Sequence, residues 1–233
     1  MNPEEIHYQR ESYKIGLENY TIDLNRNHFD ESINKVIQDY QNELNKEIRN
    51  FEDLQNENPN EYYYLDIEYL ENKLLALSEM NVVYAYKDFE INLKKLISAS
   101  YGIKSKEFYK WDNVLNFLKS KGIKYKNIEG YQEVNELRLV NNYIKHSNSL
   151  IDDNLKKINE FSDIKYMEHI CLINFFERTK NSTYIFLSNL SDEFYKDLYE
   201  FSDERLNHIA QLFALRMDKS TSKKFINFFE SKY

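Results

Sequence analysis

The chain contains few glycine and proline residues, which shape loops, and almost no cysteine, which cross-links them. Its 233 residues include four glycines, two prolines and one cysteine, Cys171. A single cysteine allows no internal disulfide and no cysteine cluster for zinc. Because glycine and proline are the strongest breakers of regular structure, their scarcity favours long helices. A reducing, cytoplasmic setting is the simplest interpretation, and no metal or other cofactor is implied.

Long hydrophobic stretches are missing as well. No apolar run approaches the roughly 18 residues that cross a bilayer, and the segment Met1–Glu5 lacks the basic-then-apolar layout of a signal peptide. Aromatic residues are abundant instead, with 20 tyrosines and 15 phenylalanines. A disordered chain is poor in such residues. The composition therefore predicts a globular protein without a membrane partner, as one large domain or one domain with a subdomain.

The formal net charge of −8 disfavours general nucleic-acid binding, but the charge is unevenly distributed. From Met1 to Glu90 there are twenty acidic and eight basic residues, a net of −12. From Ile91 to Lys126 there are nine lysines and two acidic residues, a net of +7. Such a basic block can form a local surface for an anionic ligand. It can equally be solvated, or neutralised by the acidic portion within the chain or across a dimer.

Apolar residues recur at helical spacing along most of the chain. Between residues 30 and 53, for example, Ile33, Val36, Ile37 and Tyr40 follow one another at steps of three, one and three. No internal repeat and no convincing strand alternation occurs, so the fold is predicted to be all-α. Residues 1–26 are expected to form a short helix or an arm. Further helices are expected at about 30–53, 62–99, 106–120, 131–147 and 164–187, with a loop at 56–60 and helix starts at Ser191 and Ser202.

The segment Glu136–Ser147 is the strongest functional candidate in the sequence. Residues four apart on a helix lie one above another, so Arg138, Asn142 and His146 form a polar stripe. A histidine exchanges a proton near neutral pH, and an arginine binds phosphate through two parallel hydrogen bonds. The stripe therefore fits a site that handles a phosphodiester. The alternative is a polar helix face that is merely solvated.

The region Leu74–Ser147 resembles the HEPN superfamily of small helical bundles. The resemblance covers about a third of the chain and rests on pattern more than on identity. It implies an all-α, HEPN-like up-and-down helical bundle with additional N- and C-terminal helices. The matching segments are Tyr84–Glu90, Phe108–Trp111, Leu115–Leu118 and Leu137–His146, of which the last is similar to the signature helix of the family.

On this resemblance the chain divides into three parts. Residues 1–60 are an acidic N-terminal helical extension, residues 61–160 a HEPN-like helical core, and residues 161–233 C-terminal helices that complete the bundle. Many HEPN proteins are metal-independent endoribonucleases of toxin–antitoxin, abortive-infection and antiviral defence systems. In these proteins the arginine and histidine of two protomers face each other across a dimer, and the RNA 2′-hydroxyl attacks the adjacent phosphate.

The resemblance assigns roles to individual residues of this chain. His146 matches the histidine that acts as general acid or base, and Asn142 matches the polar residue that orients a phosphate oxygen or the imidazole. Asn141 stands where the family has arginine. Arg138, which would stabilise the charge on phosphorus, then substitutes from one turn further back, or Lys145 supplies charge, or the site is inactive.

Glu90 is expected to support this site. The resemblance implies that its carboxylate hydrogen-bonds to Arg138 or His146, and an ordinary ion pair between helices is the alternative. Asn141 and Asn142 equally fit a hydrogen-bonded polar layer between packed helices.

Three functions follow from these interpretations. The first is a HEPN-like endoribonuclease or toxin of a bacterial or phage-associated defence system, acting on RNA as a homodimer. The second is a non-catalytic helical binding or regulatory module whose partner is an antitoxin or another defence-system protein. The third is a structural helical protein in which the polar stripe is only a packed seam.

Overall fold

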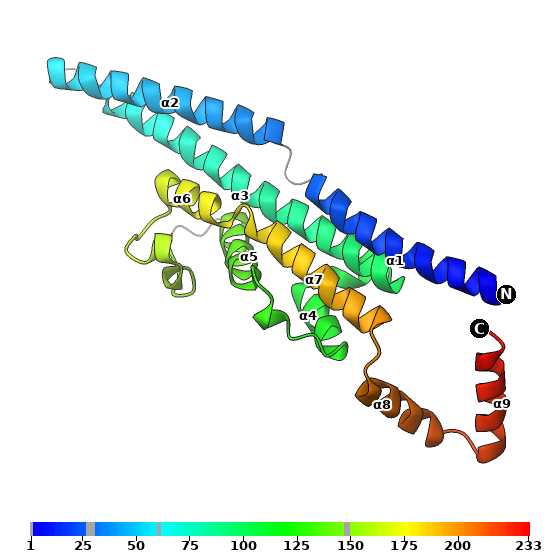
Figure 1. Cartoon of the computed structure of the whole chain (residues 1–233). Coiled ribbons are helices and arrows are strands. Elements are labelled where there is room, and N and C mark those ends of the chain that lie inside the picture. The colour runs from blue at the N-terminus through cyan, green and yellow to red at the C-terminus, as the bar shows by residue number, and fades with distance from the viewer. Residues whose placement is uncertain (1, 27–30, 60–61, 147–149) are drawn as a thin grey trace.

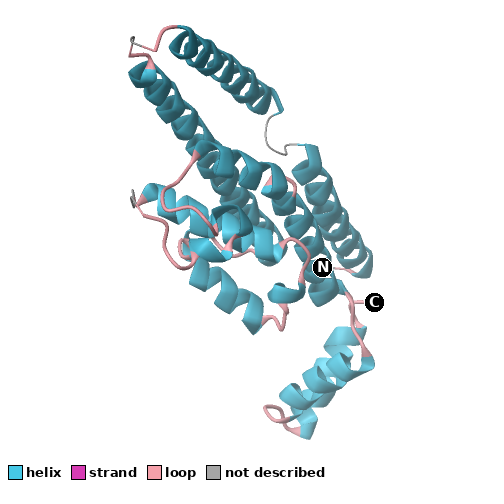
Figure 2. Ribbon diagram, turned by 90° about the vertical axis from the view of Figure 1, so that its left-hand side faces the viewer, coloured by secondary structure: helices cyan, strands magenta, loops and turns pink. Residues whose placement is uncertain are grey.

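All regular structure in the described part of the chain is helical (Figure 2). The structure is a computed structural model that describes residues 2–26, 31–59, 62–146 and 150–233, with the backbone alone for 18–26 and 31–34. Within these residues the elements are α-helices and short 3-10 helices, so the prediction of an all-α fold is confirmed. None of the described helices combines the length and the apolarity that crossing a bilayer requires.

Helices α2 (Glu31–Glu57) and α3 (Tyr64–Tyr101) form an antiparallel arm that extends beyond the rest of the molecule (Figure 1). With 38 residues, α3 is the central helix of the fold. At 1.5 Å per residue it spans about 57 Å. Both helices were predicted from their apolar spacing, and Gly102 ends α3 in the left-handed conformation that glycine tolerates. The two helices meet in a small buried cluster of Leu44, Ile48, Leu70 and Leu74.

The main core surrounds the C-terminal half of α3. Helices α4, α5, α6 and α7 form its other walls, and α1 packs against both α3 and α7. The aromatic ring of Phe89 is at the centre of this core, with its centroid 6.2 Å from Trp111 and 6.0 Å from Phe186. The bounds of these elements are Pro3–Arg26 for α1, Trp111–Ser120 for α4, Tyr131–Lys145 for α5, His169–Thr179 for α6 and Ser182–Tyr199 for α7.

The start of α5 is pressed against the start of α7. Gly130, the residue before α5, has a φ of 84°, which side chains with a Cβ rarely adopt. A Cβ built there would lie 2.6 Å from the carbonyl oxygen of Ser182. Only a glycine therefore permits this approach, which positions α5 in the core.

The last two helices, α8 (Asp203–Ala214) and α9 (Lys219–Glu230), form a hairpin that stands away from the core (Figure 1). The predicted start at Ser202 is confirmed, because its hydroxyl accepts a hydrogen bond from the Arg205 N–H at 3.2 Å. Asp218 caps α9 in the same manner, accepting from the Thr221 N–H at 2.7 Å. Neither helix contains a buried residue.

Two helices differ from their predicted bounds. The helix expected at 106–120 is divided into a 3-10 turn, Ser105–Phe108, and α4, because the segment between them leaves helical geometry at Lys110. The motif helix ends at Lys145, with His146 as its C-cap. The predicted end at residues 147–149 lies outside the described residues.

The single helix predicted at 164–187 is wrong. Its first residues are not helical: the Lys165 carbonyl accepts a hydrogen bond from the Ile151 N–H at 3.1 Å, Glu168 is extended, and α6 begins only at His169. The helix then breaks after Thr179, whose hydroxyl bonds to the Phe175 carbonyl at 2.9 Å and competes with the helical hydrogen-bond pattern.

The predicted start at Ser191 is also wrong, because this residue lies inside α7. Its neighbours Leu190 and Phe194, four residues apart, are both buried in the core and carry the helix across the Ser-Asp-Glu segment. Core packing therefore outweighs the local preference of serine for a helix start.

Candidate functional site

The guanidinium of Arg138 is held by its own helix. Its Nε and Nη2 donate to Asn135 Oδ1 at 3.3 and 3.0 Å, and its Cζ lies 6.0 Å from the centre of the Trp111 ring. His146 is eight residues further along, a rise of about 12 Å on a helix. Since Asn135 stands three residues before Arg138, these hydrogen bonds direct the guanidinium away from His146. Within one chain the two heads therefore do not share a phosphate.

His146 lies at the exposed end of α5. Its backbone N–H donates to the carbonyls of Asn142 and Tyr143 at 3.1 and 3.2 Å, so the residue closes the last turn. No described residue forms a hydrogen bond with its imidazole. The side chain of Asn142 is exposed one turn earlier. The imidazole is therefore accessible from solvent but is not oriented by a neighbour in the described part of the chain.

Asn141, which the resemblance to HEPN proteins set at their arginine position, is completely buried. Its Nδ2 donates to Asn142 Oδ1 at 3.3 Å. Its own Oδ1 is sealed from solvent and has no hydrogen-bond partner among the described residues. This buried position suits a neutral side chain, since an isolated charge that is removed from water is strongly unfavourable.

Three of the predicted site residues instead gather around Tyr86 of α3. Lys145 Nζ lies 6.0 Å from the centre of the Tyr86 ring. Burial, together with the charge of Glu90, raises the pKa of Tyr86 to about 12, and the charge of Arg138 acts in the opposite direction. Glu90, Arg138 and Lys145 therefore all lie close to one neutral phenol. We call Tyr86, Glu90, Arg138 and Lys145 the Tyr86 cluster.

The carboxylate of Glu90 is paired within its own helix. Its Oε1 accepts from Lys94 Nζ at 2.8 Å, four residues along α3. No hydrogen bond joins it to Arg138 or His146 in the described residues. Sequence reasoning missed Tyr86, although it stands four residues before Glu90, where the two side chains share a helix face.

A separate polar pocket of about 340 Å³ lies between α2, α3 and α6. Gln41 Nε2 donates to Ser78 Oγ at 3.3 Å on its wall. Asn81 is buried beside them, and its Oδ1 has no hydrogen-bond partner in the described part of the chain. Neither Arg138 nor His146 lines this pocket.

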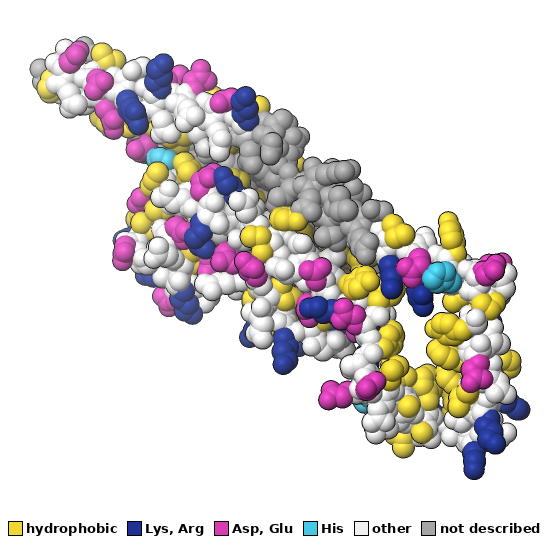
Figure 3. Space-filling model, in the orientation of Figure 1, with side chains coloured by type: hydrophobic (Ala, Val, Ile, Leu, Met, Phe, Trp, Pro, Cys, Tyr) yellow, Lys and Arg dark blue, Asp and Glu magenta, His cyan; other side chains and the backbone are white. Residues whose placement is uncertain are grey.

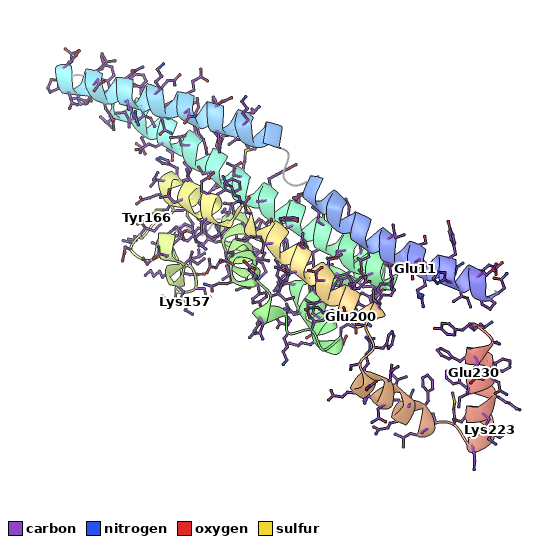
Figure 4. All side chains as sticks on the ribbon, viewed as in Figure 1. Glu11, Lys157, Tyr166, Glu200, Lys223 and Glu230 are labelled. Atoms are coloured by element: carbon purple, nitrogen blue, oxygen red, sulfur yellow. The ribbon has the colours of Figure 1, made fainter. Side chains whose placement is uncertain are left out.

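Exposed apolar side chains gather at the two ends of the molecule. The space-filling view shows hydrophobic side chains along both α8 and α9 (Figure 3). The stick view places Glu200 where the chain leaves α7, and Lys223 and Glu230 on α9 (Figure 4). The exposed large apolar residues of this hairpin are Leu206, Leu212, Phe213, Leu215, Phe225, Ile226, Phe228, Phe229 and Tyr233.

Within the described residues, no three His, Cys, Asp or Glu side chains are grouped so as to hold a metal ion. Comparison with family models, with curated proteins and with solved structures finds no match for this chain.

Proposed function

We propose that this protein is a non-catalytic helical binding module. The observation that supports this proposal is the hairpin α8–α9, which has large apolar side chains on two amphipathic helices but no buried residue. Phe228 is 70% exposed and Leu215 is 85% exposed. Contiguous apolar surface of this kind is typical of an interaction site.

The free energy available from covering the hairpin is large. Burying one large apolar side chain contributes about 1.5–3 kcal/mol, and nine such side chains are exposed on the hairpin. The two helices of the hairpin meet where Phe213 of α8 stacks on Phe225 of α9, at 5.2 Å between ring centroids, and Phe229 lies between Phe225 and Tyr233 on α9 and its end, yet all four rings stay exposed. A partner that covers α9 would therefore bind through apolar contacts.

The geometry of α5 agrees with a non-catalytic role. The buried Asn141 replaces the arginine of the HEPN motif, and Arg138 is held by Asn135 and Trp111. His146 therefore lacks the adjacent guanidinium that would stabilise the charge on phosphorus.

A second candidate is the metal-independent endoribonuclease of the HEPN type. The observation that favours it is the Tyr86 cluster, where Arg138 and Lys145 bring two positive charges to one face of α3 and α5. His146 is exposed at the end of the same helix. In a homodimer, the histidine of one protomer would act on RNA bound at the cluster of the other.

An RNA cleavage assay without metal separates the two candidates. The binding module leaves RNA intact at every protein concentration. The endoribonuclease cleaves it, loses cleavage in His146→Ala, and keeps it in the control His208→Ala, which removes an exposed histidine of α8. Cleavage with this pattern would contradict the non-catalytic proposal.

A photo-crosslinking amino acid tests the binding surface directly. Introduced at position 228 and irradiated in the host cell, it is expected to give one adduct of defined mass, identified by peptide mapping, which the additional change Phe225→Ser abolishes. Introduced at Tyr109, which is 66% exposed on the core, it is expected to give none. The absence of an adduct at position 228 would contradict the docking role of the hairpin.

A further inference from the structure

The tip of the α2–α3 arm carries a strong negative charge. We define the arm tip as Glu43–Glu57 of α2 and Tyr64–Glu71 of α3. It contains eight acidic and two basic residues, a net of −6. All eight carboxylates are exposed. None of them forms an ion pair with a described residue, so their charge is free to attract a cationic surface.

The arm tip also carries exposed apolar and aromatic side chains. Tyr64, Leu65 and Tyr69 are each more than half exposed, and Leu54 of α2 is exposed beside them. The ring of Tyr69 already has the Lys73 ammonium 4.4 Å from its centroid. Such rings bind cations through their negative faces. The tip therefore suits a partner that is both apolar and basic.

The C-terminal hairpin has the opposite charge. The segment Arg216–Tyr233 contains five basic and two acidic residues, a net of +3. All five basic side chains are exposed, and none forms an ion pair with a described residue. Lys223 and Lys224 lie directly beside the exposed Phe225 and Ile226. This surface matches the arm tip in charge and in apolar character.

The two surfaces lie at opposite ends of the molecule (Figure 1). Arg205 fixes the start of α8 to the end of α7, donating to the carbonyls of Glu200 at 2.7 Å and Lys196 at 3.2 Å. With α3 about 57 Å long, the hairpin of a chain lies too far from the arm tip of the same chain. Contact between the two surfaces therefore requires two molecules.

We propose that the C-terminal hairpin of one chain docks on the arm tip of a second copy, head to tail. This inference rests on the proposed binding function and names its partner. Unpaired carboxylates of the arm tip meet the lysines of α9, and the exposed rings of both surfaces lie against each other at the centre. Since donor and acceptor surfaces differ, the contact repeats and produces closed rings or open chains of molecules.

Charge reversal tests this contact on the full-length protein. Sedimentation velocity over a range of concentrations, at about 0.1 M salt, is expected to show self-association that weakens at about 1 M, where charges are screened beyond about 3 Å. In the variant Lys223→Glu/Lys224→Glu, both the hairpin and the arm tip are acidic. In Asp66→Lys/Glu68→Lys, the arm tip keeps less of the negative charge that complements the hairpin. Each alone is expected to associate at least about tenfold more weakly, because the first variant sets two acidic surfaces against each other and the second lowers the net charge of the arm tip from −6 to −2.

An equimolar mixture of the two variants restores one contact of the original kind, because the unchanged hairpin of the arm-tip variant meets the unchanged arm tip of the hairpin variant. The two variants are expected to form a heterodimer through this contact, with an affinity within about threefold of the original contact. Lys156→Glu/Lys157→Glu, an equal charge change at an exposed site on the core, is the matched control and is expected to leave association unchanged.

A chain that stays monomeric at every concentration would overturn the inference, as would association that neither reversal weakens or that the mixture does not restore. These failures differ from failure of the proposed function. A crosslink from position 228 to a different protein, with the chain itself monomeric, leaves the binding module standing and removes the second copy as its partner. The absence of any crosslink, together with RNA cleavage that depends on His146, removes both.

Discussion

The guanidinium of Arg178 and the carboxylate of Glu160 are joined by two parallel hydrogen bonds, from Nε to Oε1 at 2.6 Å and from Nη2 to Oε2 at 2.9 Å. The same Nη2 also donates to Glu136 Oε2 at 2.9 Å. One side chain of α6 therefore holds the 3-10 turn Asn159–Phe161 and the middle of α5 in place.

Removing this guanidinium is expected to destabilise the fold. In Arg178→Gln the free energy of unfolding should fall by about 1 kcal/mol, because two partly buried carboxylates lose their charged donor, while the exposure of Arg178 limits the effect. Urea unfolding measures the change. Lys196→Gln, which removes the exposed partner of Glu193 on α7, is the control and should cost clearly less than Arg178→Gln. Equal losses in the two variants would contradict the structural role of Arg178.

The same pair predicts a dependence on pH. The hydrogen bonds from Arg178 hold the pKa of Glu160 below its ordinary value. A carboxyl group with a lowered pKa stabilises the fold above the pKa of the unfolded chain, about 4.3, and this stabilisation is lost as the pH falls through the folded value. Thermal unfolding at successive pH values below about 5 should therefore show a steeper decline for the original protein than for Arg178→Gln. Parallel dependences of the unfolding temperature on pH in the two proteins would contradict the prediction.

Two glycine substitutions should change stability in opposite directions. Gly130→Ala places a Cβ 2.6 Å from the Ser182 carbonyl oxygen on a backbone with positive φ, and should cost about 2–4 kcal/mol. Gly16→Ala lies in α1 with no atom within 4 Å of the new Cβ, and should stabilise by about 0.5–1 kcal/mol. Urea denaturation measures both values. A tolerated Gly130→Ala would show that α5 and α7 do not approach as closely as described.

Asn141 tests whether its buried position can hold a charged side chain. Asn141→Leu removes the buried oxygen that has no partner in the described residues, and should leave the unfolding free energy within about 1 kcal/mol. Asn141→Arg buries a charge without a carboxylate partner, and should cost about 3–5 kcal/mol. Differential scanning calorimetry of the two variants decides the matter. A stable Asn141→Arg protein would mean that the side chain reaches solvent or an acid.

Two phenylalanines distinguish the hairpin from the core. Phe228 is 70% exposed, so Phe228→Ser should change the unfolding free energy by less than about 0.5 kcal/mol while it lowers the binding of a hydrophobic dye to the folded protein. Phe89 is 1% exposed, and Phe89→Ala should cost about 3–5 kcal/mol through the cavity it leaves. Comparable destabilisation by the two changes would place α9 in the core.

Much of the secondary structure could be predicted because local rules decide it. The apolar spacing in α2 and α3 predicted both helices, and Ser202 with its acidic neighbours predicted the start of α8. Local rules failed where a tertiary contact prevailed. Ser191 resembles a helix start in sequence, but buried neighbours on both sides keep it within α7.

The candidate site could be predicted only in part. Arg138, Lys145 and Glu90 were selected from the sequence, yet their common neighbour Tyr86 was not, because residues more than fifty positions apart meet only when α5 packs on α3. The direction of the Arg138 side chain depends in the same way on Trp111 of α4.

Composition and spacing alone were enough to specify an all-α protein with an acidic first portion, since helix formation and net charge depend on neighbouring residues and on simple counts. Three-dimensional packing decided that Asn141 is buried and that the last two helices stand free with their apolar faces uncovered. Helical spacing shows which residues share a face. The partner that this face meets is determined by how distant segments fill space together.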